Sequence, residues 1–209
     1  MMASEGRHSD LCQVAVRWLR QSFQSGGHGC QIAFAEPRIS YLGGESPDAI
    51  GFRVSEPSYG GGSVVVECKT SRSDFLADAR KPHRRPGEGM GRFRYFMAPD
   101  GLIEPSELPC GWGLVEVGKR HRTRVVRGAV TDVRNLQAWE QEHNAVRETL
   151  LLANLLHRIG DAGKMNSRLR DAEGRAGWLL RRCEGLEKEV SRLQAAELKR
   201  KYGHMIHDL

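Results

Sequence analysis

The chain has 209 residues, of which 39% are hydrophobic and 28% are charged, and its formal net charge is +6. This length allows one hydrophobic core with an appendage, and the positive charge favours a polyanionic partner without proving one. No apolar run is long enough to cross a bilayer, and the first residues lack the apolar stretch of a signal peptide, so no membrane partner is expected. The five cysteines contain no CxxC pair. We therefore expect neither a disulfide framework nor a zinc ribbon, and place the protein in the reducing cytoplasm of a bacterial host cell.

Helical and strand patterns alternate along the first part of the chain. The segment from Ser9-Asp10 to Gly26-Gly27 has apolar residues at helical spacing and predicts the first helix. A second helix is predicted over 73–80, with Ser71 or Ser73 as its cap. Strands are predicted over residues 30–35, 48–54, 63–70, 92–98, 112–117 and 122–127. This order predicts an α/β fold whose core is a mixed central sheet flanked by helices.

The later part of the chain has a helical character. We divide the protein into a core of residues 1–130 and a helical extension of residues 131–209, with a break at 160–163. From Met165 to Leu193, apolar residues recur at alternating steps of four and three with charged outer positions, which is the heptad pattern of a coiled coil. Each glycine inside this pattern costs about 1 kcal/mol relative to alanine. Two interpretations stay open: a coiled coil or helical hairpin, most simply an arm that makes a homodimer, or a helix that only packs back on the core.

Two acids and a lysine stand at the ends of neighbouring predicted strands. Asp48 opens one strand, and Glu67-Cys68-Lys69 ends the next, after the apolar run 64–66. Because side chains alternate along a strand, Glu67 and Lys69 share a face and Cys68 points away. Two carboxylates beside an ammonium suit a metal-dependent phosphodiester hydrolase, since carboxylates hold a hard cation and a lysine can orient water. The alternative is an ion pair at the sheet edge. The triplet has little weight alone, because Glu197-Leu198-Lys199 repeats it in a charged tail.

The order of helix, strand, Pro47-Asp48 strand, Glu67-x-Lys69 strand, helix and strand resembles the PD-(D/E)XK nuclease superfamily, whose core is that of restriction endonucleases. The resemblance runs from Ser9 to Val117 and is closest to phage and prophage proteins of that superfamily. The motifs that carry it are Gly44-Glu45-Ser46-Pro47-Asp48-Ala49-Ile50-Gly51, the run from Val65 to Asp78, Lys81-Pro82-His83-Arg84, Arg94-Tyr95-Phe96 and Gly111-Trp112-Gly113-Leu114.

The resemblance implies a role for each residue of the proposed site. Asp48, Glu67 and the main-chain carbonyl of Cys68 would bind Mg²⁺ or Mn²⁺. Lys69 would orient the attacking water and stabilise charge in the transition state. An acid on the first helix often completes such sites. Its local candidates are Glu5 and Asp10, while Glu36 and Glu45 are near enough in sequence to support the ligands.

A basic segment follows the proposed site and predicts contact with DNA. Cations that neutralise phosphates release counterions, which favours binding; the alternative is a solvated surface loop. The residues assigned to nucleic-acid binding are Ser71, Arg72, Arg80, Lys81, His83, Arg84 and Arg85, and the basic cluster continues to Arg92 and Arg94.

These features together predict a function. The first hypothesis is a Mg²⁺- or Mn²⁺-dependent deoxyribonuclease of phage or prophage origin that works in DNA repair, recombination or phage–host conflict. The second is a catalytically silent relative that binds a host protein or nucleic acid, such as an inhibitor of a defence system. The presence of Asp48, Glu67 and Lys69 together favours the enzyme.

Overall fold

In the part of the chain that the computed structural model describes, residues 2–37, 46–56, 60–78, 81 and 85–202, six strands form one mixed sheet in sequence order. β3, β4 and β5 are parallel, and the other neighbouring strands are antiparallel. The strands are β1 (Ile32–Ala35), β2 (Ala49–Arg53), β3 (Gly62–Cys68), β4 (Phe93–Pro99), β5 (Trp112–Val117) and β6 (Thr123–Arg127). The predicted α/β fold with a mixed sheet is therefore confirmed.

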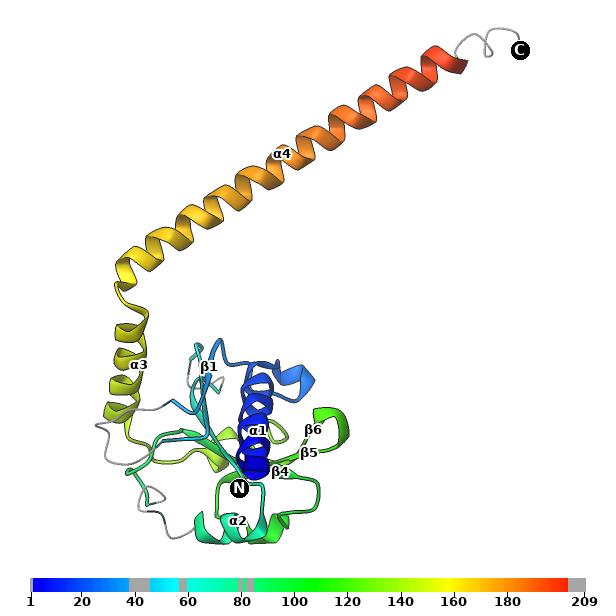
Figure 1. The fold of residues 1–209 in the computed structure, drawn as a ribbon. Helices are drawn as coiled ribbons and strands as arrows, with labels where there is room; N and C mark the ends of the chain where they lie inside the picture. Colours follow the sequence, from blue (N-terminus) through cyan, green and yellow to red (C-terminus); the bar gives the residue numbers. More distant parts are fainter. Residues whose placement is uncertain (1, 38–45, 57–59, 79–80, 82–84, 203–209) are drawn as a thin grey trace. The chain divides into compact units, whose positions relative to one another are not determined.

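The described residues contain four α-helices, and Figure 1 shows α1 crossing the sheet. They are α1 (Met2–Arg20), α2 (Arg72–Asp78), α3 (Ala145–Ile159) and α4 (Ala162–Tyr202). α1 begins well before the predicted start at Ser9, which lies inside the helix. Single-turn 3₁₀ helices occupy Phe23–Ser25, Pro105–Glu107, Lys119–His121 and Leu136–Trp139.

The sheet buries a different hydrophobic cluster on each face. On one face, Trp18 and Leu19 of α1 pack with Val64 and Val66 of β3. On the other face, Phe75 of α2 packs with aromatic and aliphatic side chains of β4 and β5. Burial of apolar surface on both sides explains why β3 and β4 read as nearly continuous apolar runs. The central strands are thus held between α1 and α2.

The chain divides into two compact units, Met1–Asn154 and Leu155–Leu209, so the boundary lies later than the residue 130 expected from the sequence. Two residues of α3 explain the difference. Leu151 is fully buried, and the Glu148 carboxylate accepts hydrogen bonds from the Ser63 hydroxyl (2.7 Å) and the Gly91 backbone N–H (2.8 Å). Residues 131–154 therefore belong to the first unit, although they are helical or irregular in sequence character.

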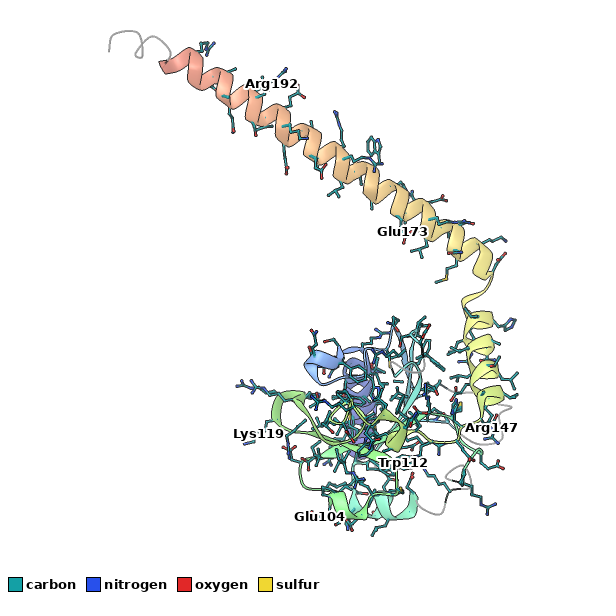
Figure 2. The ribbon with its side chains drawn as sticks, turned by 180° about the vertical axis from the view of Figure 1, so that it is seen from behind. Glu104, Trp112, Lys119, Arg147, Glu173 and Arg192 are labelled. Carbon is teal, nitrogen blue, oxygen red and sulfur yellow. The ribbon has the colours of Figure 1, made fainter. Side chains whose placement is uncertain are left out.

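α4 is one uninterrupted helix of 41 residues, and its large apolar side chains are exposed to solvent. The predicted break is confirmed, because α3 ends at Ile159 and α4 begins at Ala162. Leu169 is 55% exposed and Leu193 is 58% exposed, and Figure 2 shows Glu173 and Arg192 projecting from the same helix. None of the described helices is both long and apolar enough to cross a membrane.

His28 is buried completely in the core beneath α1, with its Nε2 atom 2.8 Å from the Tyr95 hydroxyl. Burial, together with the nearby Arg53 charge, lowers the pKa of His28 from 6.5 to about 3. Because the folded pKa lies below the unfolded one, the stability from neutral His28 is fully present above pH 6.5 and is lost as the pH falls toward 3.

We therefore expect the free energy of unfolding to fall on acidification below pH 6.5, with His28 contributing up to about 1.4 kcal/mol per pH unit. Urea unfolding of wild type and His28→Phe between pH 7 and pH 5 measures this contribution, and the variant should show the shallower slope. His157→Gln, at an exposed position of α3, is the control and should keep the wild-type slope. Equal slopes in wild type and His28→Phe would contradict the prediction.

Candidate active site

The strand register brings Asp48 and Glu67 to the same edge of the sheet. β2 and β3 are antiparallel, and Ala49 pairs with Val66. One further step along this ladder places Asp48 opposite Glu67. The Glu36 backbone N–H donates to the Asp48 carbonyl at 2.9 Å, so the antiparallel pairing on the β1 side also reaches Asp48. The two acids that the sequence analysis paired are thus neighbours at the carboxyl end of β3.

The Asp48 carboxylate is held from two sides. Its Oδ2 atom accepts a hydrogen bond from the Cys68 backbone N–H at 2.8 Å, and its Oδ1 atom lies 3.2 Å from His8 Nε2. Burial raises the pKa of the Asp48 carboxyl, and the Glu67 charge raises it further, against the opposing effects of the Cys68 N–H, His8 and Lys69. A divalent cation would relieve this repulsion between carboxylates, so Asp48 and Glu67 fit a Mg²⁺ or Mn²⁺ ion.

Lys69 lies on the α2 side of the sheet among three carboxylates. Its Nζ atom is 2.7 Å from Asp78 Oδ1, 3.7 Å from Glu67 Oε2 and 3.9 Å from Asp74 Oδ1. Burial alone would lower the pKa of Lys69, but Glu67, Asp78 and Asp74 together raise it above its usual value. Lys69 therefore stays an ammonium at neutral pH, so it can supply positive charge but cannot act as a general base.

The alternation predicted for the end of β3 is confirmed. Glu67 and Lys69 point to the face that carries α2, whereas Cys68 belongs to the cluster beneath α1. The Cys68 thiol shares a hydrogen bond with the Cys12 thiol, and this bond, together with burial, raises the pKa of Cys68 well above its usual value. The role of the Cys68 main-chain carbonyl as a metal ligand stays a prediction.

An acid was expected on α1, but the residue that faces Asp48 is His8. Asp10 turns elsewhere and lines a separate pocket of about 240 Å³ with Leu11 and Thr70. The helical repeat explains this, because residues two apart point in different directions. The side chain of Glu5 and all of Glu45 lie outside what the structure describes, and Glu36 is exposed.

Sequence reasoning missed three residues of this site: His8, Cys12 and Asp78. Asp78 is 1% exposed and contacts Lys69. A signal for it was present, because Asp74 and Asp78 stand one helical turn apart directly after the lysine. His8 and Cys12 have the same spacing on α1, but their partner, Asp48, is visible only in the folded chain.

The residues assigned to DNA binding differ in what they contact. The Ser71 hydroxyl accepts the Asp74 backbone N–H at 3.3 Å and thus caps α2, as predicted. Arg72 is paired with Glu107, and Lys81 Nζ lies 2.9 Å from Asp78 Oδ1. Arg85 is exposed. Arg80, His83 and Arg84 lie outside the described residues.

Arg92 and Arg94 are structural, which corrects their place in the predicted basic cluster. Arg94 is only 2% exposed, and its guanidinium donates to the carbonyl oxygens of Gly91 and Gly89. Arg92 donates to the Gly61 carbonyl at 2.7 Å and pairs with Glu140. These guanidiniums tie loops to the sheet, so they cannot also reach a phosphate.

A second basic surface lies on the turn between β5 and β6. Lys119, Arg120, Arg122 and Arg124 line an open pocket of about 620 Å³ together with Asp100, Gly118 and Thr123. Figure 2 shows Lys119 at the margin of the first unit. These basic residues are visible in the sequence, but residues 122–127 were interpreted only as a strand. We name these four cations the basic hairpin.

Comparison with known proteins leaves the activity open. No family model matches the chain, and no curated protein matches it. It is similar to a solved structure of a protein of unknown function from Silicibacter pomeroyi, with a TM-score of 0.46 and 23% identity over 78% of this chain and 91% of that one. This likeness is too low to carry an argument, so the functional assignment depends on the residues of the site.

The ion pair between Lys69 and Asp78 is buried on both sides. Asp78→Asn removes the carboxylate nearest to the buried Lys69 ammonium and leaves only the more distant Glu67 and Asp74, so we expect it to lower the free energy of unfolding by about 3 kcal/mol. Glu107→Gln, which breaks the exposed pair with Arg72, is the control and should change stability little. Urea unfolding of both variants measures the difference, and similar effects of the two substitutions would contradict the prediction.

Proposed function

We propose that the protein is a Mg²⁺- or Mn²⁺-dependent deoxyribonuclease built on a PD-(D/E)XK core. The observation that carries the proposal is the meeting of Asp48 and Glu67 across neighbouring strands, with the Lys69 ammonium 3.7 Å from Glu67. An ion pair that served only to cap the sheet edge would not require a second, partly buried carboxylate beside the buried Glu67. The raised pKa of Asp48 supports a site that gains from a cation.

Each residue has a role that follows from its surroundings. Asp48 and Glu67, with the Cys68 carbonyl, would hold the ion, which when bound polarises the phosphate and lowers the pKa of water. Lys69, charged at neutral pH, would stabilise negative charge that develops on the phosphate. Asp78 positions the Lys69 ammonium through their 2.7 Å contact.

The cationic side chains that are not engaged by a carboxylate would bind the DNA phosphates. Arg72 and Lys81 are engaged with Glu107 and Asp78. In the basic hairpin, Arg124 is likewise engaged with Glu116. Arg85 and the other three cations of the hairpin therefore become the stronger candidates for phosphate contacts, and they agree with the net charge of +6. Such contacts carry no sequence information, so they suit a nuclease that acts on many DNA sequences.

The setting that we propose is phage or prophage DNA repair, recombination or phage–host conflict. The second candidate is a catalytically silent protein of this fold that binds a host protein or nucleic acid. The long exposed helix α4 favours some partner in either case. Cleavage activity separates the two candidates.

We also propose that α4 pairs with α4 of a second copy, because most of its large apolar residues, Trp178 and Leu180 excepted, fall on one exposed seam. In heptad notation, the a positions are Leu169, Ala176, Cys183 and Val190, and the d positions are Met165, Ala172, Leu179, Leu186 and Leu193.

The charges beside this seam select a parallel, in-register pair. In that arrangement, each g position faces the e position of the partner's next heptad. Arg168 would then face the partner's Glu173, and Arg182 would face the partner's Glu187. An antiparallel pair would instead set the arginine-rich g row against itself. Charge complementarity therefore favours the parallel dimer.

Isosteric removal of the site's charges tests the nuclease proposal. We expect Asp48→Asn and Glu67→Gln each to lower cleavage of plasmid, linear and branched DNA by about 100-fold or more in Mg²⁺ or Mn²⁺, because each loses a charged ligand. Asp10→Asn, which changes an acid of α1 that lines another pocket, should keep wild-type activity. The absence of cleavage by the wild-type protein on every substrate would favour the silent binding protein.

Oxidative cross-linking tests the dimer. A parallel, in-register pair places the two exposed Cys183 thiols opposite each other, so mild oxidation should give a disulfide-linked dimer in a Cys110→Ser background. Glu187→Arg should weaken the dimer by setting it against Arg182, and the added change Arg182→Glu should restore it. Light scattering measures the oligomeric state, and a monomeric wild type would refute the pairing.

A further inference from the structure

Three different donor groups meet where α1 passes the beginning of β2. His8 and Cys12 stand one turn apart on α1, and Asp48 immediately precedes β2. A ring nitrogen of His8, the Cys12 sulfur and a carboxylate oxygen of Asp48 all lie within 4.8 Å of one another. This separation allows one ion to contact all three after small side-chain movements.

The surroundings orient these donors toward one another. Asp48 Oδ2 accepts a hydrogen bond from the Cys68 backbone N–H, so Oδ1 is the oxygen that faces His8 Nε2, at 3.2 Å. Cys12 is fully buried, whereas the side chains of His8 and Asp48 are 30% and 20% exposed. The cluster is therefore closed on the cysteine side and open to solvent on the histidine side, which provides a path for an ion.

The donor types select the kind of metal. Mg²⁺ prefers oxygen ligands alone, whereas imidazole and thiolate ligands suit Zn²⁺ and similar transition metals. Three protein ligands with a fourth position left for water is the arrangement found in catalytic zinc sites.

We propose that His8, Cys12 and Asp48 bind one Zn²⁺-class transition-metal ion. On binding, the Cys12 thiol gives its proton to solvent and coordinates as thiolate, while His8 coordinates as neutral imidazole. The proposal does not depend on the nuclease function, although Asp48 is common to both sites. Because one carboxylate serves both, an ion held by His8 and Cys12 would alter how Asp48 takes part in Mg²⁺ binding.

Cobalt spectroscopy of the metal-free protein tests the site directly. Co²⁺ bound by a thiolate produces a sulfur-to-metal charge-transfer band in the near ultraviolet, so titration with Co²⁺ should give this band and saturate at one ion per chain. Added Zn²⁺ should abolish the band by displacement, since Zn²⁺ binds such ligand sets more tightly than Co²⁺.

Variants distinguish this site from other thiols. Cys12→Ser should remove the charge-transfer band, and His8→Gln should weaken Co²⁺ binding by about tenfold or more. Cys110→Ser and Cys183→Ser, which change the exposed cysteines, should keep the wild-type spectrum. His8 is partly exposed, so His8→Gln tests the site without disturbing the core as a change at Cys12 would.

The site is refuted if the wild-type protein shows no charge-transfer band, or if the band and the Co²⁺ affinity persist in both Cys12→Ser and His8→Gln. A wild-type protein that shows the band but does not cleave DNA would refute the nuclease proposal and leave this site intact. A wild-type protein that cleaves DNA in Mg²⁺ but shows no cobalt band would refute this site and leave the nuclease proposal intact. The two proposals therefore fail separately.

Discussion

The alternation of side chains along β3 is the constraint on which both the fold and the proposed site depend. Val64 and Val66 point toward α1 and fill one hydrophobic cluster, and Cys68 continues the same row. Glu67 and Lys69 point the other way, toward α2. Since a strand in the middle of a sheet cannot slip by one residue without exposing its apolar face, the packing of α1 also decides where the two charged groups lie.

Glu67 and Lys69 are almost completely buried, and a small number of charged groups neutralise one another around them. Lys69 meets Asp78, Glu67 and Asp74, and Lys81 contacts Asp78 and Glu67 from the more exposed side. A buried ammonium is stable here because carboxylates outweigh the cost of its burial. The same groups keep Lys69 protonated and fixed in place, which suits electrostatic stabilisation of a phosphate.

The basic residues of the chain separate into groups with different tasks. Arg92 and Arg94 donate to backbone carbonyls and hold loops against the sheet. Arg72 is engaged with Glu107 at the surface. The basic hairpin groups its cations around an open pocket, where they can meet an anionic partner. Net charge alone does not separate these tasks, because it counts a buried guanidinium and an exposed one equally.

The sequence by itself determined the order of the elements, the alternation at the end of β3 and the pairing of Asp48 with Glu67, because these follow from local periodicity and from turn residues between adjacent strands. The break before α4 was also readable, since Gly160 and Asp161 interrupt the helical pattern. Only the tertiary structure showed that Asp78 holds Lys69, that His8 rather than an acid faces Asp48, and that Glu148 joins α3 to the first unit. These contacts join residues of separate elements, and their geometry depends on how α1, α2 and α3 pack, which no local pattern in the sequence records.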